Sequence, residues 1–195
     1  MKCQQGILFE QVPAVARHVF LTLADSQDVP RALAALAAQA DGIDTVVGLG
    51  VAAAQALGKQ LPLLRVFPAL SNQGIDVPST QHALWLWLRG EDRGELLLRT
   101  MQLEQLLAPA FKVVQVTDSF RYLSGHDLSG YEDGTENPVG DEAVQVVTAP
   151  DQLGGSYAAI QHWEHDLAYM QALPQQEQDH IIGRRLSGNE EIEDA

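Results

Sequence analysis

One short stretch, residues 82–88, constrains the fold more than any other part of this 195-residue chain. Successive side chains of an extended strand point to opposite faces. Here the two sets are Ala83, Trp85 and Trp87 on one face and Leu84, Leu86 and Leu88 on the other. Because both faces are apolar, we expect a strand that lies inside a sheet and is covered on both sides.

The segments around this strand predict an alternation of strands and helices. Three further apolar runs predict strands, at residues 17–24, 44–50 and 111–117. Helical spacing predicts two longer helices and a short alanine-rich one, at residues 28–40, 91–107 and 51–57. Apart from the short helix, the order is the βαββαβ arrangement of a ferredoxin-like domain. We therefore expect an α+β fold that begins with such a domain over residues 1–125.

Cap and stripe signals support the two longer helices. Asp28 is placed to cap the first helix, with Pro30 in its first turn. The second helix carries four side chains on one stripe, Leu96, Thr100, Leu103 and Leu107. Residues 58–80 lose this periodicity, and the proline-interrupted run 61–68 fits an edge or an extended covering segment.

Composition argues against several kinds of partner. With 46% hydrophobic residues the chain can bury a normal core, but its formal net charge of -14 opposes binding to nucleic acid or to an anionic membrane surface. A single cysteine, Cys3, excludes an internal disulfide and a cysteine-only metal cluster. No signal peptide and no apolar run of membrane-spanning length is evident. We expect a cytoplasmic protein.

A loop rich in glycine and hydrogen-bonding side chains follows the first domain, at residues 130–138. Gly130 and Gly134 permit backbone angles that other residues avoid, and they allow a ligand to come close. The proline after Asn137 keeps that residue out of helical geometry. A loop that holds Asp133 between two glycines is more often a site than a connector. The alternative is a rigid turn in which Asp133 bonds to its own backbone.

The run from Gly130 to Pro138 resembles the G-x-x-D-G signature of the dye-decolourising, or Dyp-type, haem peroxidases and its continuation in bacterial members. The resemblance implies an oxidoreductase that binds haem b, reduces hydrogen peroxide and oxidises dyes or phenolic reductants. It implies that Asp133 is the catalytic distal acid–base and that the protein forms homo-oligomers. It also implies that the cofactor's distal wall is shaped by Gly130, Gly134, Thr135, Glu136 and Asn137.

In this family a second ferredoxin-like unit holds the haem, and we expect its start over residues 126–195. Residues 156–165 predict a strand, and Asp166 is placed to cap a short helix that begins at Leu167. Pro174 opens another short helix that runs to about Ile182 and is closed by the following glycine. The sequence ends after this one strand and its helices, so we expect the second unit to be incomplete.

The sequence departs from the family pattern in its length. The family's proximal histidine, the axial iron ligand, follows an acidic stretch like residues 189–194, and the distal arginine comes later still. The sequence ends at Ala195, so the resemblance implies that the proximal ligand is not present here. His126, His162, His165 and His180 each read more simply as surface or hydrogen-bonded side chains. The alternative function is therefore a truncated, non-catalytic ferredoxin-like oligomerisation module that has lost haem binding.

Overall fold

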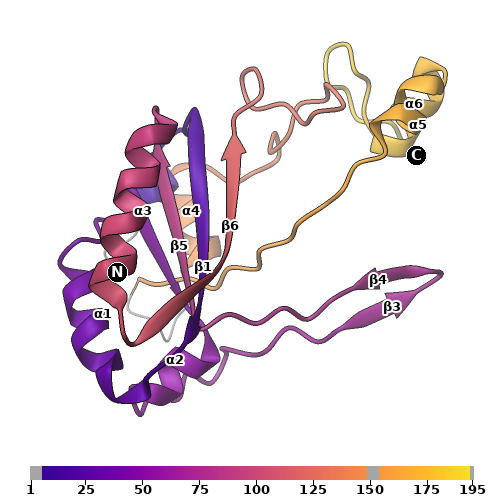
Figure 1. The fold of residues 1–195 in the computed structure, drawn as a ribbon. Coiled ribbons are helices and arrows are strands. Elements are labelled where there is room, and N and C mark those ends of the chain that lie inside the picture. Colours follow the sequence, from indigo (N-terminus) through magenta and orange to yellow (C-terminus); the bar gives the residue numbers. More distant parts are fainter. Residues whose placement is uncertain (1–5, 149–153, 194–195) are drawn as a thin grey trace. The chain divides into compact units, whose positions relative to one another are not determined.

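The computed structural model describes residues 6–148 and 154–193, so Cys3 lies outside the described residues (Figure 1). The chain divides into two compact units. The first unit is Met1–Phe120 with Val147–Tyr157, and the second unit is Arg121–Val146 with Ala158–Ala195. The expected domain boundary at residue 125 stays a prediction.

An antiparallel sheet of four strands forms the centre of the first unit. Its strands are β1 (Val15–Leu23), β2 (Thr45–Leu49), β5 (Leu84–Gly90) and β6 (Phe111–Phe120). They lie in the order β2-β5-β1-β6, so the first and third long strands occupy the middle. In register, Val19 of β1 lies opposite Leu86 of β5 on one side and Val116 of β6 on the other. The α+β, ferredoxin-like expectation is confirmed.

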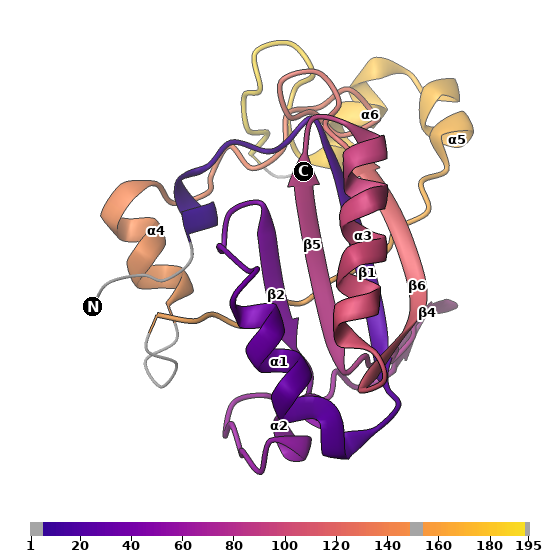
Figure 2. The same ribbon diagram turned by 60° about the vertical axis from the view of Figure 1, so that its left-hand side comes forward.

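Helices cover one face of this sheet. They are α1 (Val29–Ala37), α2 (Val51–Ala56) and α3 (Arg93–Leu107), and Figure 2 shows α1 and α3 in front of the strands. All four residues of the predicted α3 stripe are buried, and Leu107 is fully buried. Its three leucines, Leu96, Leu103 and Leu107, pack with Leu84, Leu86 and Leu88 in one hydrophobic core. Burial of this apolar stripe stabilises the helix against the sheet.

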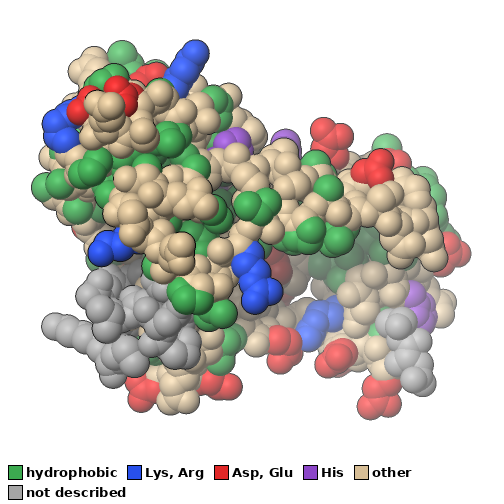
Figure 3. Space-filling view, turned by 90° about the horizontal axis from the view of Figure 1, so that it is seen from below, with side chains coloured by type: hydrophobic (Ala, Val, Ile, Leu, Met, Phe, Trp, Pro, Cys, Tyr) green, Lys and Arg blue, Asp and Glu red, His purple; other side chains and the backbone are tan. Residues whose placement is uncertain are grey.

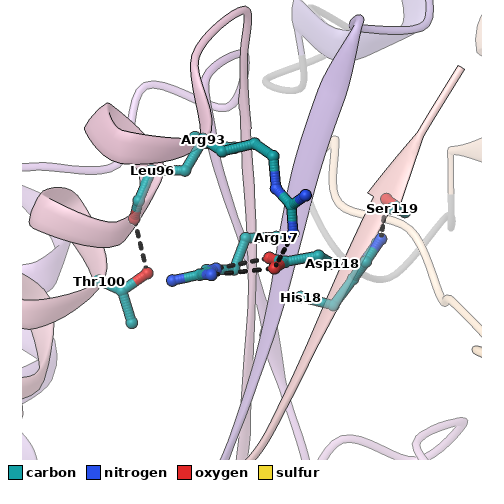
Figure 4. Close-up of polar contacts among 7 residues, drawn as sticks. All are labelled: Arg17, His18, Arg93, Leu96, Thr100, Asp118 and Ser119. Atoms are coloured by element: carbon teal, nitrogen blue, oxygen red, sulfur yellow. Dashed lines mark hydrogen bonds and ion pairs between the residues drawn. The ribbon is translucent and has the colours of Figure 1, made fainter.

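The opposite face of the sheet carries the two tryptophans of β5, which are half-buried. His18 of β1 lies beside them, with ring centroids 5.9 Å from Trp85 and 5.8 Å from Trp87. Trp85 Nε1 donates a hydrogen bond to His18 Nδ1 at 3.2 Å, and His18 Nε2 contacts Ser119 Oγ at 3.2 Å (Figure 4). Burial lowers the pKa of His18. Strand β5 is thus fully covered on its leucine face and partly on its tryptophan face.

An ion-paired triad joins two strands and the start of α3. Arg17 Nε and Nη2 donate to the Asp118 carboxylate at 2.6 and 3.0 Å, and Arg93 Nη2 donates at 3.1 Å (Figure 4). Arg17 and Asp118 are opposite each other in the register of β1 and β6. The triad therefore fixes the N-terminal end of α3 over the edge strand.

Local end signals have mixed outcomes. Asp92 caps α3 by accepting from the Glu95 amide, at 2.9 Å. The prediction that Asp28 caps the first helix is correct for its position and wrong for the hydrogen bond that a cap makes. Asp28 occupies the cap position but makes no cap hydrogen bond, and its carboxylate lies 3.5 Å from Arg31 Nε instead. The Asp25 carboxylate caps the preceding short 3-10 helix η2 (Ser26–Asp28) by accepting from the Gln27 amide.

A hairpin of two short strands, β3 (Leu70–Asn72) and β4 (Ile75–Val77), projects from the first unit (Figure 1). The sequence predicts only an extended segment nearby, at residues 61–68, so the hairpin was not predicted. Its turn has positive φ at Gln73 and Gly74, which is the geometry of a tight hairpin. The dipeptide Gln73-Gly74 and the β-branched residues Ile75 and Val77 after it could have indicated the hairpin.

Three helices belong wholly or mainly to the second unit. They are α4 (Gly140–Val147), which the sequence argument missed, α5 (Leu167–Ala172) and α6 (Gln175–Ile182). Asp166 caps α5 by accepting from the Tyr169 amide at 2.9 Å. Gly183 ends α6 with a left-handed φ of 82°. Both predicted helix ends are therefore confirmed.

The predicted strand at residues 156–165 is wrong. These residues have no regular secondary structure and are mostly exposed, so His162 and Glu164 share no strand face. A strand forms when a neighbour satisfies its backbone groups. The described part of the second unit contains only isolated bridges, which offer no such ladder.

Many large hydrophobic side chains reach the surface of the described chain (Figure 3). None of its helices has the length and apolar character that crossing a lipid bilayer demands.

Candidate functional site

The loop that carries Asp133 is built from two successive backbone reversals in the second unit. The Asp127 amide donates to the Tyr131 carbonyl at 2.9 Å, and the Gly130 amide donates back to the Asp127 carbonyl at 2.9 Å. Gly130 has a φ of 98°, which side chains rarely adopt. The Asp133 amide then donates to the Gly125 carbonyl at 3.3 Å. The sequence Gly-Tyr-Glu-Asp-Gly therefore folds as a shaped loop held by its own backbone.

The Asp133 side chain is exposed and makes no hydrogen bond or ion pair to another described residue. It therefore does not bond to its own backbone, as the rigid-turn alternative requires. A carboxylate in this condition can accept a proton from a bound molecule. The loop geometry presents the acid rather than using it as a structural link.

Gly134 makes room for the next part of the loop. Its φ is 69°, and a Cβ built there would lie 2.7 Å from Asn137 Nδ2. The Asn137 backbone amide donates to the Gly134 carbonyl at 3.1 Å. The absence of a side chain at Gly134 thus lets the side-chain amide of Asn137 pack against the turn.

A shallow cleft of about 410 Å³ adjoins this turn. Its lining combines polar and apolar side chains, from Thr135, Glu136, Asn137, Pro138, Val139, Glu142 and Val146. Three of the predicted cofactor-binding residues therefore line one cleft, whereas Gly130 and Gly134 shape the backbone beside it. Helix α4, missed from the sequence, contributes the cleft's Glu142 and Val146.

Tyr131 anchors the loop to α6 by a contact that the sequence argument missed. Tyr131 is only 3% exposed, and its Oη donates to Asp179 Oδ1 at 2.6 Å. Burial, and then the neighbouring Asp179 carboxylate, raise the pKa of Tyr131 to about 12. Hydrogen bonds from Tyr131 and Gln175 hold the pKa of Asp179 below its usual value. No sequence pattern links these residues, which lie 48 positions apart.

Two further ion contacts connect the loop region with other parts of the second unit. Arg184 Nη2 donates to Glu136 Oε1 at 2.9 Å, and its Nη1 donates to the Asn189 carbonyl at 3.0 Å. His165 Nε2 lies 3.1 Å from Asp127 Oδ2. Arg184 thus approaches one of the predicted cofactor-binding residues from outside the motif.

The histidines of the second unit lie at separate places. His126 Nδ1 contacts Ser124 Oγ at 3.3 Å, His165 is engaged with Asp127, and His162 and His180 are exposed. The described residues contain no group of three or more histidine, cysteine or acidic side chains that could hold a metal ion. The cleft lining includes no histidine.

A larger pocket, of about 490 Å³, lies in the first unit, and its lining includes no predicted site residue. Its Asp41 carboxylate already accepts the amides of Ile43, Asp44 and Thr45, each at 2.9 Å. Its Arg99 Nη1 donates to the Asp44 carbonyl at 3.1 Å. These polar groups satisfy one another, so we regard this pocket as structural and the Asp133 loop as the candidate site.

Comparison with curated proteins relates the chain to peroxidases. A family model described as "Dyp-type peroxidase, C-terminal" matches residues 124–195. The dye-decolorizing peroxidase of Rhodococcus erythropolis is 32% identical over 161 residues, which are 80% of this chain and 47% of that protein. That of Mycobacterium tuberculosis is 30% identical over 135 residues, 67% of this chain and 40% of that protein. The chain thus spans about half the length of these relatives or less.

Solved structures have the same fold. A protein of Shewanella oneidensis assigned to the Dyp-type peroxidases superposes with a TM-score of 0.85 and 26% identity, over 99% of this chain and 68% of that one. A variant of DypB from Rhodococcus jostii, in complex with haem, gives a TM-score of 0.77 and 24% identity, over 97% of this chain and 67% of that one. Together with the motif loop and the sheet topology, these similarities show that the chain belongs to the Dyp-type peroxidase family.

Proposed function

We propose that this chain supplies the distal side of a haem b peroxidase, which reduces hydrogen peroxide and oxidises a dye or a phenolic reductant. The observation that carries the proposal is the exposed Asp133 carboxylate, unpaired among the described residues, on a loop of the family's signature sequence. The family membership supports the reaction class. The chain spans about half of its curated relatives, so the activity of the whole protein is part of the proposal.

The described residues fit the distal side of a haem in their chemistry. The cleft, whose lining begins at Thr135, combines apolar groups, which suit a porphyrin edge, with polar groups that can bind a small oxygen-containing molecule. Thr135, Glu136 and Asn137 are the side chains that would face the cofactor region, and the two glycines would allow its close approach. We assign no axial iron ligand within the described part of the chain.

When bound, haem supplies an iron that binds peroxide and takes up its oxidising equivalents. The chain's own contribution is proton movement. The Asp133 carboxylate accepts the proton of the inner peroxide oxygen and delivers it to the outer oxygen, which leaves as water. Asn137 and Thr135 of the cleft lining are placed to orient the peroxide by hydrogen bonds.

The test is replacement of the acid without change of shape. After haem reconstitution, followed by its absorption band, Asp133→Asn should retain the cofactor and lose about 100-fold or more of peroxide-dependent dye turnover. Glu132→Gln is the matched control, because that neighbouring carboxylate is also exposed. Undiminished turnover in Asp133→Asn, or an equal loss in Glu132→Gln, would contradict the distal-acid role. Failure of every form to bind haem would favour the non-catalytic module.

We also propose that the protein forms a homo-oligomer. The support includes exposed apolar side chains on the first unit: Leu97 and Met101 of α3 and Val116 of the edge strand β6 are 43–49% exposed. Strand β6 pairs on one side only, which leaves backbone donors and acceptors open to a partner. Sedimentation of the purified chain measures the assembly, and a purely monomeric species at micromolar concentration would contradict this proposal.

A further inference from the structure

Tyr131 and Asp179 form a buried polar contact that the proposed reaction does not use. Their side chains meet at 2.6 Å, and the two residues are 3% and 7% exposed. Asp179 is the only charged residue of the described second unit that is buried. Burial of a charge is costly unless hydrogen bonds compensate it. We therefore looked for the role of this buried carboxylate in the loop that it contacts.

One oxygen of Asp179 joins three segments of the second unit. Besides Tyr131 Oη from the motif loop, Asp179 Oδ1 accepts Gln175 Nε2 at 2.8 Å and the Leu186 amide at 3.1 Å. Gln175 Nε2 also lies 3.0 Å from Tyr131 Oη. Gln175 lies one turn before Asp179 on α6, and Leu186 follows the helix. The loop is therefore fastened to the helix and to the segment that leaves it.

Neighbouring contacts hold the loop on both sides of position 133. Before it, the Leu186 side chain lies 3.6 Å from the place of a Cβ at Gly130. After it, Arg184 binds Glu136 at 2.9 Å. The Glu136 side chain is 81% exposed, so that ion pair is weak. The buried Tyr131 contact is consequently the strongest side-chain tether in the described loop, and it lies two residues before Asp133.

We propose that the hydrogen bond from Tyr131 to Asp179 is a positioning contact, which fixes the motif loop on α6 and thereby the direction of the Asp133 carboxylate. The inference rests on the proposed role of Asp133 as the distal acid. Charge-assisted hydrogen bonds are short and directional, and a buried one restricts the backbone near it more than apolar packing does. A phenylalanine at position 131 would fill the same space without this restriction.

The first test is amide hydrogen exchange of the 195-residue chain, followed by NMR. Tyr131→Phe should speed exchange of the Asp133 amide by roughly tenfold, the effect of losing one hydrogen bond to a charged group. The Val19 amide in the first unit should not change. Tyr169→Phe is the matched control, because Tyr169 belongs to the same unit and is 60% exposed. Unchanged exchange at Asp133 in Tyr131→Phe would overturn the proposal.

A double-variant cycle separates this contact from general packing. Asp179→Ala should speed exchange at Asp133 at least as much as Tyr131→Phe does, because it also removes the contacts to Gln175 and the Leu186 amide. The combined variant should not exceed Asp179→Ala alone, because the Tyr131 contact is already lost in that variant. Additive effects would show that the two residues act independently and would also overturn the proposal.

Turnover of the haem-reconstituted protein distinguishes this inference from the proposed function. We expect Tyr131→Phe to lower kcat about tenfold and to leave KM for the dye unchanged, since Tyr131 and Asp179 are both buried and offer no surface to a dye. If Asp133→Asn abolishes turnover while Tyr131→Phe alters neither kcat nor exchange, the positioning role is wrong and the proposed function stands. If Asp133→Asn keeps full turnover, the proposed function fails, whatever Tyr131→Phe does to exchange.

Discussion

At the scale of single residues, Asp118 shows how one carboxylate fixes an arrangement of elements. It accepts three hydrogen bonds, two from Arg17 and one from Arg93 (Figure 4). The hydrogen bond from Arg17 is the main reason why the pKa of Asp118 falls from 3.8 to about 2. Arg93 is 73% exposed, so its contribution is screened by solvent. The bidentate pair between the two strands is the effective contact.

Asp118→Asn should lower the stability of the first unit by about 1 kcal/mol at neutral pH, after allowance for solvent screening. The pKa of Asp118 is depressed in the folded chain, so its stabilisation is fully present above the unfolded value of 3.8 and is lost as pH falls toward about 2. The difference between the two proteins should therefore shrink over this range. Urea unfolding followed by tryptophan fluorescence measures it.

The control for this prediction is Asp76→Asn on the β3–β4 hairpin. Asp76 has no ion pair to another described residue, and its replacement should change stability little. An equal loss in both variants, or a difference that persists undiminished into acid, would contradict the role given to Asp118.

At the scale of elements, the helices agree with their sequence signals better than the strands do. Helix α3 spans Arg93–Leu107, where residues 91–107 were predicted, and it buries all four residues of the predicted stripe. Helix α5 begins after its predicted cap residue Asp166, and α6 begins after Pro174 and ends at Gly183 as predicted. A helix satisfies its backbone groups within one segment, so local residues carry most of the information.

Strands depend on partners that local sequence does not identify. Residues 156–165 have apolar and aromatic side chains typical of a strand, yet they form no regular secondary structure. Conversely, residues 70–77 form a hairpin whose two strands have only three residues each. Pairing, rather than propensity, decides both cases.

The packing of α3 gives a prediction at this scale. Leu107→Ala should destabilise the first unit by about 3 kcal/mol, because Leu107 is fully buried and its truncation leaves a cavity. Leu98→Ala on the outer side of the same helix should cost no more than about 0.5 kcal/mol, since Leu98 is 60% exposed. Denaturant unfolding compares them, and similar losses would contradict the described orientation of the helix.

At the scale of the whole molecule, the two units differ in how much apolar surface they bury. The first unit contains one continuous core of buried residues from the sheet, α1, α2 and α3. In the described second unit, the buried hydrophobic residues are Tyr131 and Ala143, and several large ones are exposed. A unit with few buried apolar contacts opens at a lower free energy.

Amide exchange should therefore separate the two units. The amides of β1 and β5 should exchange at the rate of global unfolding, whereas those of α5 and α6 should exchange much faster through local opening. NMR or mass spectrometry of the intact chain measures both sets in one experiment. Equal protection of α5 and β5 would show that the second unit is stabilised by contacts beyond those described.

The candidate site divides in the same way between local and distant information. Residues 130–138 could be identified from the sequence because two glycines, an acid between them and the following proline require a shaped loop. Their cofactor roles remain proposals. Asp179, Gln175 and Arg184 could not be predicted as partners of the loop, because hydrogen bonds between distant side chains leave no local pattern.

The amino-acid sequence by itself determined the order of the four long strands and three helices of the first unit, the buried stripe of α3, the start of α5, both ends of α6, and the family. Each of these depends on spacing or on a short motif within one segment. Only the tertiary structure decided which apolar runs pair as strands, that the Asp28 side chain makes no cap hydrogen bond, and that Tyr131 is anchored on α6. These outcomes depend on which distant groups meet, and that is settled by packing of the whole chain.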